Sequence, residues 1–364
     1  MDKQIIKIGI VGCGGIANGK HMPALSKIEG VEMVAFCDII PERAQSAAKA
    51  FGAADAKVYE DYCELLQNPD VMVVHVLTPN ISHSEISCAA MRAGKDVMCE
   101  KPMAISSIEA KKMIDCQKET GRKLSIGYQN RFRPECLYLK ECCENGDLGE
   151  VYYARAQAVR RRAVPTWGVF LDEEKQGGGP LIDIGTHALD LTLWCMDNYE
   201  PEMVVGTVYR KLGDRENSAN IFGSWDPKEF TVEDSAFGFV RMKNGATVFL
   251  ESSWALNTLL VDEAKTILCG TEAGADMLGP KDKPLRINGE RYAKTYELTP
   301  DLGASAVAYY SGTSGDPGVA EAQSWVNYVR GEGDLVTKPD QAYVVTQILE
   351  AIYESGKTGK PIFF

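Results

Sequence analysis

The sequence predicts an α/β protein with a doubly wound parallel sheet in its N-terminal part and a second α/β domain with antiparallel strand pairs. The chain has 364 residues, which is long for a single hydrophobic core. Strand and helix patterns alternate with short links through its first third, as in parallel sheets. After residue 131 this alternation stops, and Asn244-Gly245 joins two strand patterns as a hairpin would.

The first strand is expected at residues 5–11, where IIKIGIV is an apolar, β-branched run typical of a strand buried on both faces. It leads into GCGGIA (12–17), a G-x-G-x-x-G/A pattern. Gly12 would allow a tight turn, Gly14 a close approach of a pyrophosphate, and Ala17 close packing of helix on strand. The amides of Gly15 and Ile16, at the start of the next helix, would then face the phosphates. The pattern predicts a dinucleotide site.

The second strand, at 31–38, ends in Asp38, which lies 26 positions after Gly12. An acid at this place accepts hydrogen bonds from the hydroxyls of the adenosine ribose. Its carboxylate would repel a 2′-phosphate, so NAD is expected rather than NADP. Arg43 is close enough to leave NADP as the alternative.

Further strands are expected at 71–79, 95–102 and 123–128, with helices at 84–94 and 107–121. Ligands of doubly wound sheets bind beyond the carboxyl ends of the strands. This rule places the following residues along the cofactor crevice: Thr78, Pro79, Asn80, His83, Glu100, Lys101, Pro102, Gln129, Asn130 and Arg131. Lys101 has two interpretations, a solvated residue at a strand end or a restrained ammonium that polarises a substrate hydroxyl.

Composition excludes several classes of partner. A formal charge of −12, from 39 basic and 51 acidic residues, argues against nucleic acid and anionic membrane. No apolar run approaches the roughly 20 residues of a membrane helix, and the N-terminal run lacks the length and cleavage site of a secretory signal. The eleven cysteines and four histidines show no zinc spacing. We therefore expect a cytoplasmic protein with reduced thiols and no metal site.

The second half opens with the pattern of a helix, and its remaining elements are expected as strands at 151–160, 235–254 and 263–279 and helices at about 319–330 and 340–356. Between them, GGGPLIDIGTHALD (177–190) starts a helix that is apolar around most of its circumference and therefore buried. Asp183 and His187 lie four residues apart on one of its faces, about 6 Å from each other. Two interpretations compete: a satisfied polar pair in the core, or the acid/base end of an active site that lines a cavity.

These motifs, with TPNISHSEISCAAMRAGKDVMCEKPMA (78–104) and GYQNRF (127–132), resemble the Gfo/Idh/MocA oxidoreductases, and the resemblance resumes at 177–191 and at 342–364. It implies an N-terminal Rossmann domain, placed at 1–126, and a C-terminal α/β domain at 127–364 with a large, mostly antiparallel sheet. The open face of that sheet would form a homo-oligomer, a dimer, tetramer or larger. The resemblance also implies that Lys101, Asp183 and His187 form the catalytic set.

Hydride transfer from a carbinol carbon needs a base for the hydroxyl proton, and histidine, with an ordinary pKa near ~6.5, suits this task. We expect His187 to take the proton, Asp183 to orient it or a neighbouring hydroxyl, and Lys101 to bind the reacting oxygen across the domain cleft. Lysine as the base is the alternative. Residues expected beside them at a sugar are Arg131, Arg160, Trp167 and Asn257. Trp167 could stack on the C–H face of a pyranose.

The stretch from Arg160 to Phe170 also resembles relatives that oxidise the C3 hydroxyl of glucose or glucosides. The expected function is therefore NAD-dependent oxidation of a sugar or glycoside hydroxyl. Three alternatives stay open: an inositol or polyol dehydrogenase, an NAD-dependent glycosidase that oxidises its sugar transiently, and an NAD-sensing regulatory protein.

Overall fold

The computed structural model describes residues 4–279, 282–302 and 316–364. The chain divides into two compact units, whose described residues fall within Met1–Phe132 and Gly312–Tyr343 for the first and within Arg133–Ser311 and Val344–Phe364 for the second. The expected division into 1–126 and 127–364 contains no such return of the chain to the first unit.

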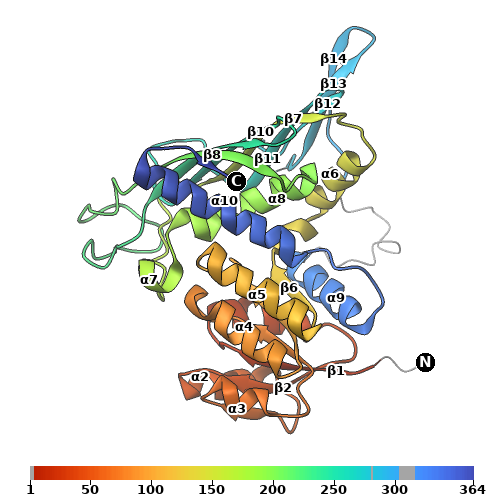
Figure 1. Ribbon diagram of the computed structural model, residues 1–364, viewed down its shortest axis with the longest axis vertical. Helices are drawn as coiled ribbons and strands as arrows, with labels where there is room; N and C mark the ends of the chain where they lie inside the picture. Colours follow the sequence, from red (N-terminus) through yellow and green to blue (C-terminus); the bar gives the residue numbers. More distant parts are fainter. Residues whose placement is uncertain (1–3, 280–281, 303–315) are drawn as a thin grey trace. The chain divides into compact units, whose positions relative to one another are not determined.

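The first unit is built on a six-stranded sheet in the order β3-β2-β1-β4-β5-β6, and every pairing in it is parallel. Figure 1 labels β1, β2 and β6 of this sheet. Its strands are β1 (Ile6–Val11), β2 (Val31–Cys37), β3 (Lys57–Tyr59), β4 (Val73–Val76), β5 (Asp96–Glu100) and β6 (Leu124–Gly127). This order is the Rossmann topology, with the switch point between β1 and β4. The predicted doubly wound sheet is confirmed.

Helices and helical turns connect these strands: η1 (Ala17–His21), α1 (Met22–Leu25), α2 (Pro41–Phe51), α3 (Tyr62–Leu66), η2 (Asn80–Ser82), α4 (His83–Arg92), α5 (Ser107–Thr120) and η3 (Gln129–Phe132). From the C-terminal part of the chain, α9 (Pro317–Arg330) joins the same unit. It does so because Trp325 and Val326 are buried in one hydrophobic cluster with Ile8 and Ile10 of the central strand. The apolar face of α9 thus completes the core of the Rossmann unit.

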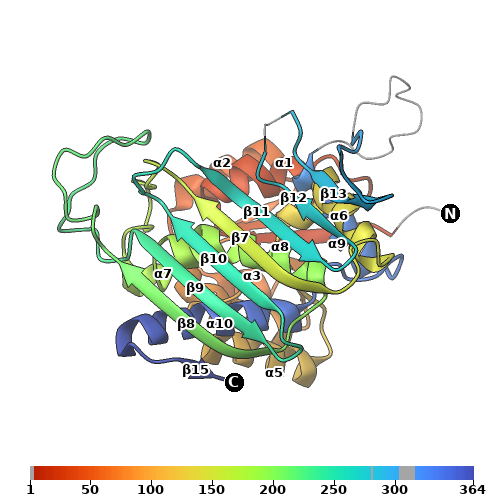
Figure 2. The ribbon, with the colours of Figure 1, turned by 90° about the horizontal axis from the view of Figure 1, so that it is seen from above.

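The second unit is built on a nine-stranded sheet in the order β14-β13-β12-β11-β7-β10-β9-β8-β15, shown face-on in Figure 2. Its strands are β7 (Val151–Val159), β8 (Pro201–Tyr209), β9 (Ser235–Met242), β10 (Thr247–Ser253), β11 (Asp262–Gly270), β12 (Ala273–Asp276), β13 (Arg286–Arg291), β14 (Lys294–Leu298) and β15 (Ile362–Phe363). The pairing of β10 with β7 is parallel, and the other pairings among the described strands are antiparallel. The expected large, mostly antiparallel sheet is confirmed.

The helices of the second unit are α6 (Pro134–Glu144), α7 (Glu173–Gln176), η4 (Leu181–Gly185) and α8 (Thr186–Met196), and α10 (Pro339–Thr358) begins in the first unit and continues in the second. Helix α8 packs on β7 and β11 and buries ten of its eleven residues. The helix predicted from Leu181 to Met196 therefore exists, but its first turn is π-helical. Among the described residues, no helix has both the length and the apolarity to cross a membrane.

Candidate functional site

The glycine-rich turn after β1 lies tightly against the rest of its sheet. Gly12 has a φ of +92°, and a Cβ added to it would stand 2.6 Å from the carbonyl oxygen of Leu77, just after β4. Its amide donates to the Cys37 carbonyl at the end of β2, at 2.8 Å. Only glycine fits this position, because a side chain would collide with backbone.

Gly14 and Gly15 face open space instead. Among the described atoms, a Cβ added to either would meet nothing within 4 Å. Ile16 beside them is 42% exposed. Backbone amides at a helix start, bordered by residues without side chains, form a cradle of the kind that a pyrophosphate fills. The residues present therefore fit a dinucleotide.

Asp38 is tied to the same turn. One carboxylate oxygen accepts the amide of Cys13 at 2.8 Å, and the other accepts the amide of Ile40 at 2.9 Å. Each oxygen keeps a second lone pair, so the carboxylate can still accept a ribose hydroxyl. The structure brings Asp38 and the glycine turn together as the spacing predicted.

The side chain of His83, predicted to contact the cofactor, lies between two loops of the first unit. It is fully buried, and its ring nitrogens lie 2.9 Å from the Thr78 carbonyl and 2.8 Å from the Pro102 carbonyl. The imidazole therefore connects the loop after β4 with the loop after β5, where Lys101-Pro102 is a cis peptide. We keep His83 as a residue that supports these loops.

Two further predicted contacts are also buried. Glu100 is almost completely enclosed and binds Lys20 and His21, each at 2.7 Å. Arg131 has no exposed surface, and it donates to the Val336 carbonyl at 2.9 Å and to Gln341 at 2.7 Å. Both side chains make their contacts in the interior of the first unit. Lys101 and Asn130, by contrast, are partly exposed to solvent.

In the second unit, Asp183 sits in the π-helical turn η4, and His187 follows in the first turn of α8. The amide of Thr186 reaches the Leu181 carbonyl, five residues back, which gives the turn its π form. Such turns are frequent at functional sites. The indole N–H of Trp254, a fully buried residue after β10, donates to a carboxylate oxygen of Asp183 at 3.1 Å. Asp183 is thereby fixed in orientation.

Arg160 lies near this carboxylate. Burial alone would lower the pKa of Arg160, but hydrogen bonds to Glu263 and the charges of Glu263 and Asp183 raise it. Both bonds to Glu263 are 2.7 Å long, so the guanidinium is held by a bidentate pair. The charge of Asp183 also acts on this guanidinium, and the contact of Arg160 with a substrate stays a prediction.

Trp167 belongs to a row of aromatic rings that leads toward Trp254. It meets Phe222 edge-on at 4.8 Å and Phe170 at 5.7 Å, and Phe170 in turn lies 6.4 Å from Trp254. Half of Trp167, 52%, is exposed. Its indole is therefore partly accessible to a ligand. Asn257 accepts a hydrogen bond from Arg162 at 2.5 Å.

The glycines before η4 pack against their own unit. A Cβ on Gly178 would stand 2.1 Å from the Tyr353 hydroxyl, and one on Gly179 would stand 2.2 Å from the Glu233 carbonyl. The Glu233 carboxylate accepts the amides of Gly179 and Leu181 at 2.8 and 3.0 Å and the Tyr353 hydroxyl at 2.8 Å. A buried carboxylate thus fixes the segment that leads to Asp183.

The pH dependence of folding tests the environment of Glu233. Burial raises its pKa to about 7, against the effect of its three donors. A group whose folded-state pKa is raised stabilises the fold fully below the unfolded value of 4.5, and this contribution is lost as the pH rises to about 7. Glu233→Gln cannot ionise. We therefore expect its free energy of unfolding to rise by roughly 3 kcal/mol relative to that of the wild type between these two pH values.

Urea unfolding of both proteins across that pH window measures this difference. If the wild type instead became more stable than Glu233→Gln as the pH rose, the hydrogen bonds from the three donors would outweigh the cost of burying the charge.

Sequence reasoning missed Trp254, Glu233 and Lys20. Trp254 acts on Asp183 from 71 positions away, and Glu233 acts on Gly179 from 54 positions away. No spacing rule links such positions. The one available signal was the acidic pair Glu233-Asp234 directly before a strand.

Comparison with protein-family models assigns most of the chain. Residues 6–128 match the model described as oxidoreductase family, NAD-binding Rossmann fold. Residues 136–276 match the model described as GFO/IDH/MocA C-terminal domain. The two matches fall on the first and second units described above.

Similar proteins include sugar dehydrogenases. The chain is 33% identical over 359 residues to D-glucoside 3-dehydrogenase of Escherichia coli (strain K12), which covers 99% of this chain and 97% of that protein. It is 32% identical over 252 residues to glucose-6-phosphate 3-dehydrogenase of Bacillus subtilis (strain 168), covering 68% and 67%. A solved structure of levoglucosan dehydrogenase with NADH and L-sorbose shares the fold, with a TM-score of 0.83 at 21% identity over 99% of each chain.

Proposed function

We propose that this chain, which belongs to the Gfo/Idh/MocA family of oxidoreductases, oxidises the C3 hydroxyl of a sugar or glycoside to a ketone with NAD as its cofactor. The observation that carries this proposal is the 33% identity to D-glucoside 3-dehydrogenase along nearly the whole of both chains. Identity of this extent includes both units, so it covers the substrate half as well as the cofactor half. Fold alone would not favour one substrate over another.

The cofactor is proposed to lie along the carboxyl edge of the six-stranded sheet. The residues that would hold it are Gly12, Gly14, Gly15, Ile16, Asp38, Thr78, Pro79, Asn80 and Asn130. Support comes from the open space above Gly14 and Gly15 and from the free lone pairs of Asp38. The same carboxylate would repel a 2′-phosphate, which favours NAD over NADP. When bound, NAD accepts the hydride of the substrate.

Three side chains are proposed to handle the substrate hydroxyl. His187 removes the hydroxyl proton as the hydride leaves, because a neutral imidazole is a suitable base near neutral pH. Asp183, oriented by Trp254, positions a hydroxyl or the imidazole itself. Lys101, at the end of β5, binds the reacting oxygen with its ammonium group. The proposal therefore requires both units to act on one substrate.

The sugar ring is proposed to stack on Trp167, whose half-exposed indole supports this role. Arg160 would contact substrate hydroxyls from the same unit. Arg131 is left out of the direct contacts, since it has no exposed surface. Its guanidinium instead stabilises the segment that follows β6.

The second sheet supports the proposed homo-oligomer. Val205, Phe239 and Phe249 lie side by side across β8, β9 and β10 by strand register. Val205 and Phe249 are each more than a third exposed. An apolar stripe of this kind on an open sheet face fits contact with a second copy of the chain.

Absorbance at the NADH band, followed with a panel of glucosides, free sugars, sugar phosphates and inositols, tests the function. We expect steady NADH formation with a glucoside or glucose and at least about tenfold lower kcat/KM with NADP in place of NAD. Product mapping by NMR should then show a ketone at C3. Aglycone release without net NADH would favour the glycosidase alternative, and inositol as the best substrate would replace the sugar assignment.

A further inference from the structure

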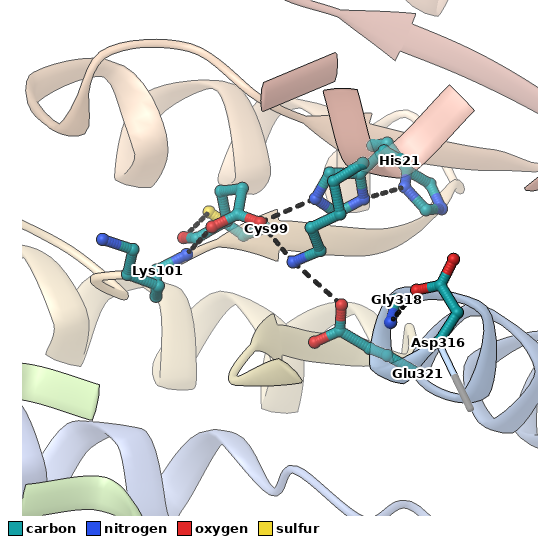
Figure 3. A network of polar contacts seen from close by, with 9 residues as sticks. His21, Cys99, Lys101, Asp316, Gly318 and Glu321 are labelled. Carbon is teal, nitrogen blue, oxygen red and sulfur yellow. Dashed lines mark hydrogen bonds and ion pairs between the residues drawn. The ribbon is translucent and has the colours of Figure 1, made fainter. Parts of the chain in front are cut away.

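A buried ion-pair cluster lies inside the first unit. The ammonium of Lys20 lies 2.7 Å from Glu100 Oε1 and 2.9 Å from Glu321 Oε2. These three side chains are at most 11% exposed. They come from η1, β5 and α9, so the cluster joins segments that are 80 and 301 positions apart. Figure 3 shows these contacts as a connected network that includes His21, Glu321 and the backbone of Lys101.

Glu100 connects the cluster to the lysine that follows it. Its Oε2 accepts the backbone amide of Lys101 at 2.9 Å, while its Oε1 accepts Lys20 and His21. Both carboxylate oxygens are therefore in use, and the carboxylate cannot rotate without breaking a contact. The backbone of Lys101 is fixed by the same group that Lys20 fixes.

Lys20 is placed for this by its helix. The amide of Met22 donates to the Ala17 carbonyl, five residues back, so η1 is a π-helical turn like the one that carries Asp183. On the other side, α9 is held by the burial of Trp325 in the core and by an Asp316 N-cap that accepts the amide of Gly318 at 2.9 Å. Glu321 is thus presented from a rigid helix.

The charges make Lys20 hard to replace. Two buried carboxylates share one ammonium, and loss of that ammonium would leave them without a compensating charge. Burial alone would lower the pKa of Lys20, but Glu100 and Glu321 more than offset this and raise it. Lys20 therefore stays protonated, whereas burial raises the pKa of Glu321.

We propose that Lys20 is a positioning residue for Lys101: by binding Glu100 and Glu321 together, it holds the carboxylate that fixes the Lys101 backbone to helix α9. The inference rests on the proposed function insofar as Lys101 acts on the substrate. The inference gives helix α9, which no sequence motif connects with the substrate, a role in positioning Lys101.

The test compares Lys20→Met with Lys20→Arg, which retains the charge, and with Lys27→Met as a matched control. Lys27 also pairs with a residue next to α9, Asp316 at 3.4 Å, but both partners are exposed and neither contacts Glu100. If Lys20→Met fails to fold, the double variant Lys20→Met/Glu321→Gln is used instead, because it removes one positive and one negative charge together.

The first readout is hydrogen exchange, followed by mass spectrometry, of the peptide Cys99–Met103 in the full-length protein. We expect the Lys101 amide to exchange at least about fivefold faster in Lys20→Met than in the wild type. In Lys27→Met its exchange rate should not change, because of the two lysines only Lys20 binds Glu100. Unchanged exchange in folded Lys20→Met, or in folded Lys20→Met/Glu321→Gln, overturns the proposal. This arm needs no substrate, so it stands even if no sugar is oxidised and the proposed function fails.

The second readout is kinetic. Lys20→Met should lower kcat about ten- to a hundredfold with KM within about twofold, as expected for a displaced catalytic group, and Lys20→Arg should recover part of the loss. In a Lys101→Ala background the same substitution should cost less than about twofold, since the group it positions is gone. Losses that multiply across the two backgrounds would show a general structural role and overturn the proposal.

Discussion

His187→Ala is expected to lower kcat by about 10³-fold or more while the protein keeps its affinity for NADH. A base that removes the hydroxyl proton contributes about 10²–10⁴-fold, and alanine cannot replace it. NADH affinity should persist, because the residues proposed to hold the cofactor belong to the first unit and His187 to the second. Initial-rate assays with the best substrate of the panel measure kcat, and NADH fluorescence titration measures the affinity for NADH.

Two further variants separate the alternatives for the base. His187→Gln keeps a polar side chain of similar reach that cannot take up a proton, so it should be nearly as inactive as His187→Ala. Lys101→Ala should lose activity as well, but added primary amines should restore part of it only if the lysine ammonium is what is missing. Wild-type turnover in His187→Gln would transfer the base role to Lys101.

The Rossmann half of the fold follows closely from local sequence. Five of its six strands are short apolar runs ended by glycine or polar residues, and the glycine turn and Asp38 meet as their spacing predicts. The exposed strand β3, with the sequence KVY, was not predicted. Each step depends on residues that are neighbours in the chain or on adjacent strands. The hairpin at Asn244-Gly245 was predictable for the same reason.

Contacts over long sequence separations were not predictable. The apolar face of helix α9 does not by itself specify which unit it packs on, and its place follows from the burial of Trp325 beside β1. The orientation of Asp183 by Trp254 is a further case, because an indole at the end of a strand usually indicates packing alone.

Glycine-rich turns before a helix have two uses. One is a backbone that approaches a ligand, as proposed for Gly14. The other is close packing within the protein, since Gly178 and Gly179 make room for Tyr353 and Glu233 of their own unit. Both situations require a residue without a side chain, so the sequence alone does not distinguish a glycine that faces a ligand from one that faces a neighbouring helix.

Gly12 and Gly14 should separate these two uses of glycine within a single turn. Gly12→Ala would place a Cβ 2.6 Å from the backbone oxygen of Leu77 at a φ of +92°, and neither can relax without moving β1 or β4. We expect a loss of about 3–5 kcal/mol in the free energy of unfolding, from strain and overlap together. Thermal and urea unfolding measure it, and wild-type stability would mean that the turn relaxes freely.

Gly14→Ala should behave in the opposite way. Its Cβ would meet no described atom within 4 Å, so the melting temperature should stay within about 2 °C of the wild type. The methyl group would instead occupy space proposed for the pyrophosphate and weaken NADH binding by about tenfold or more, which is at least about 1.4 kcal/mol. Fluorescence titration measures this affinity. If Gly14→Ala bound NADH as tightly as the wild type, the open space above this glycine would have no role in cofactor binding, and the pyrophosphate would have to lie elsewhere along the sheet edge.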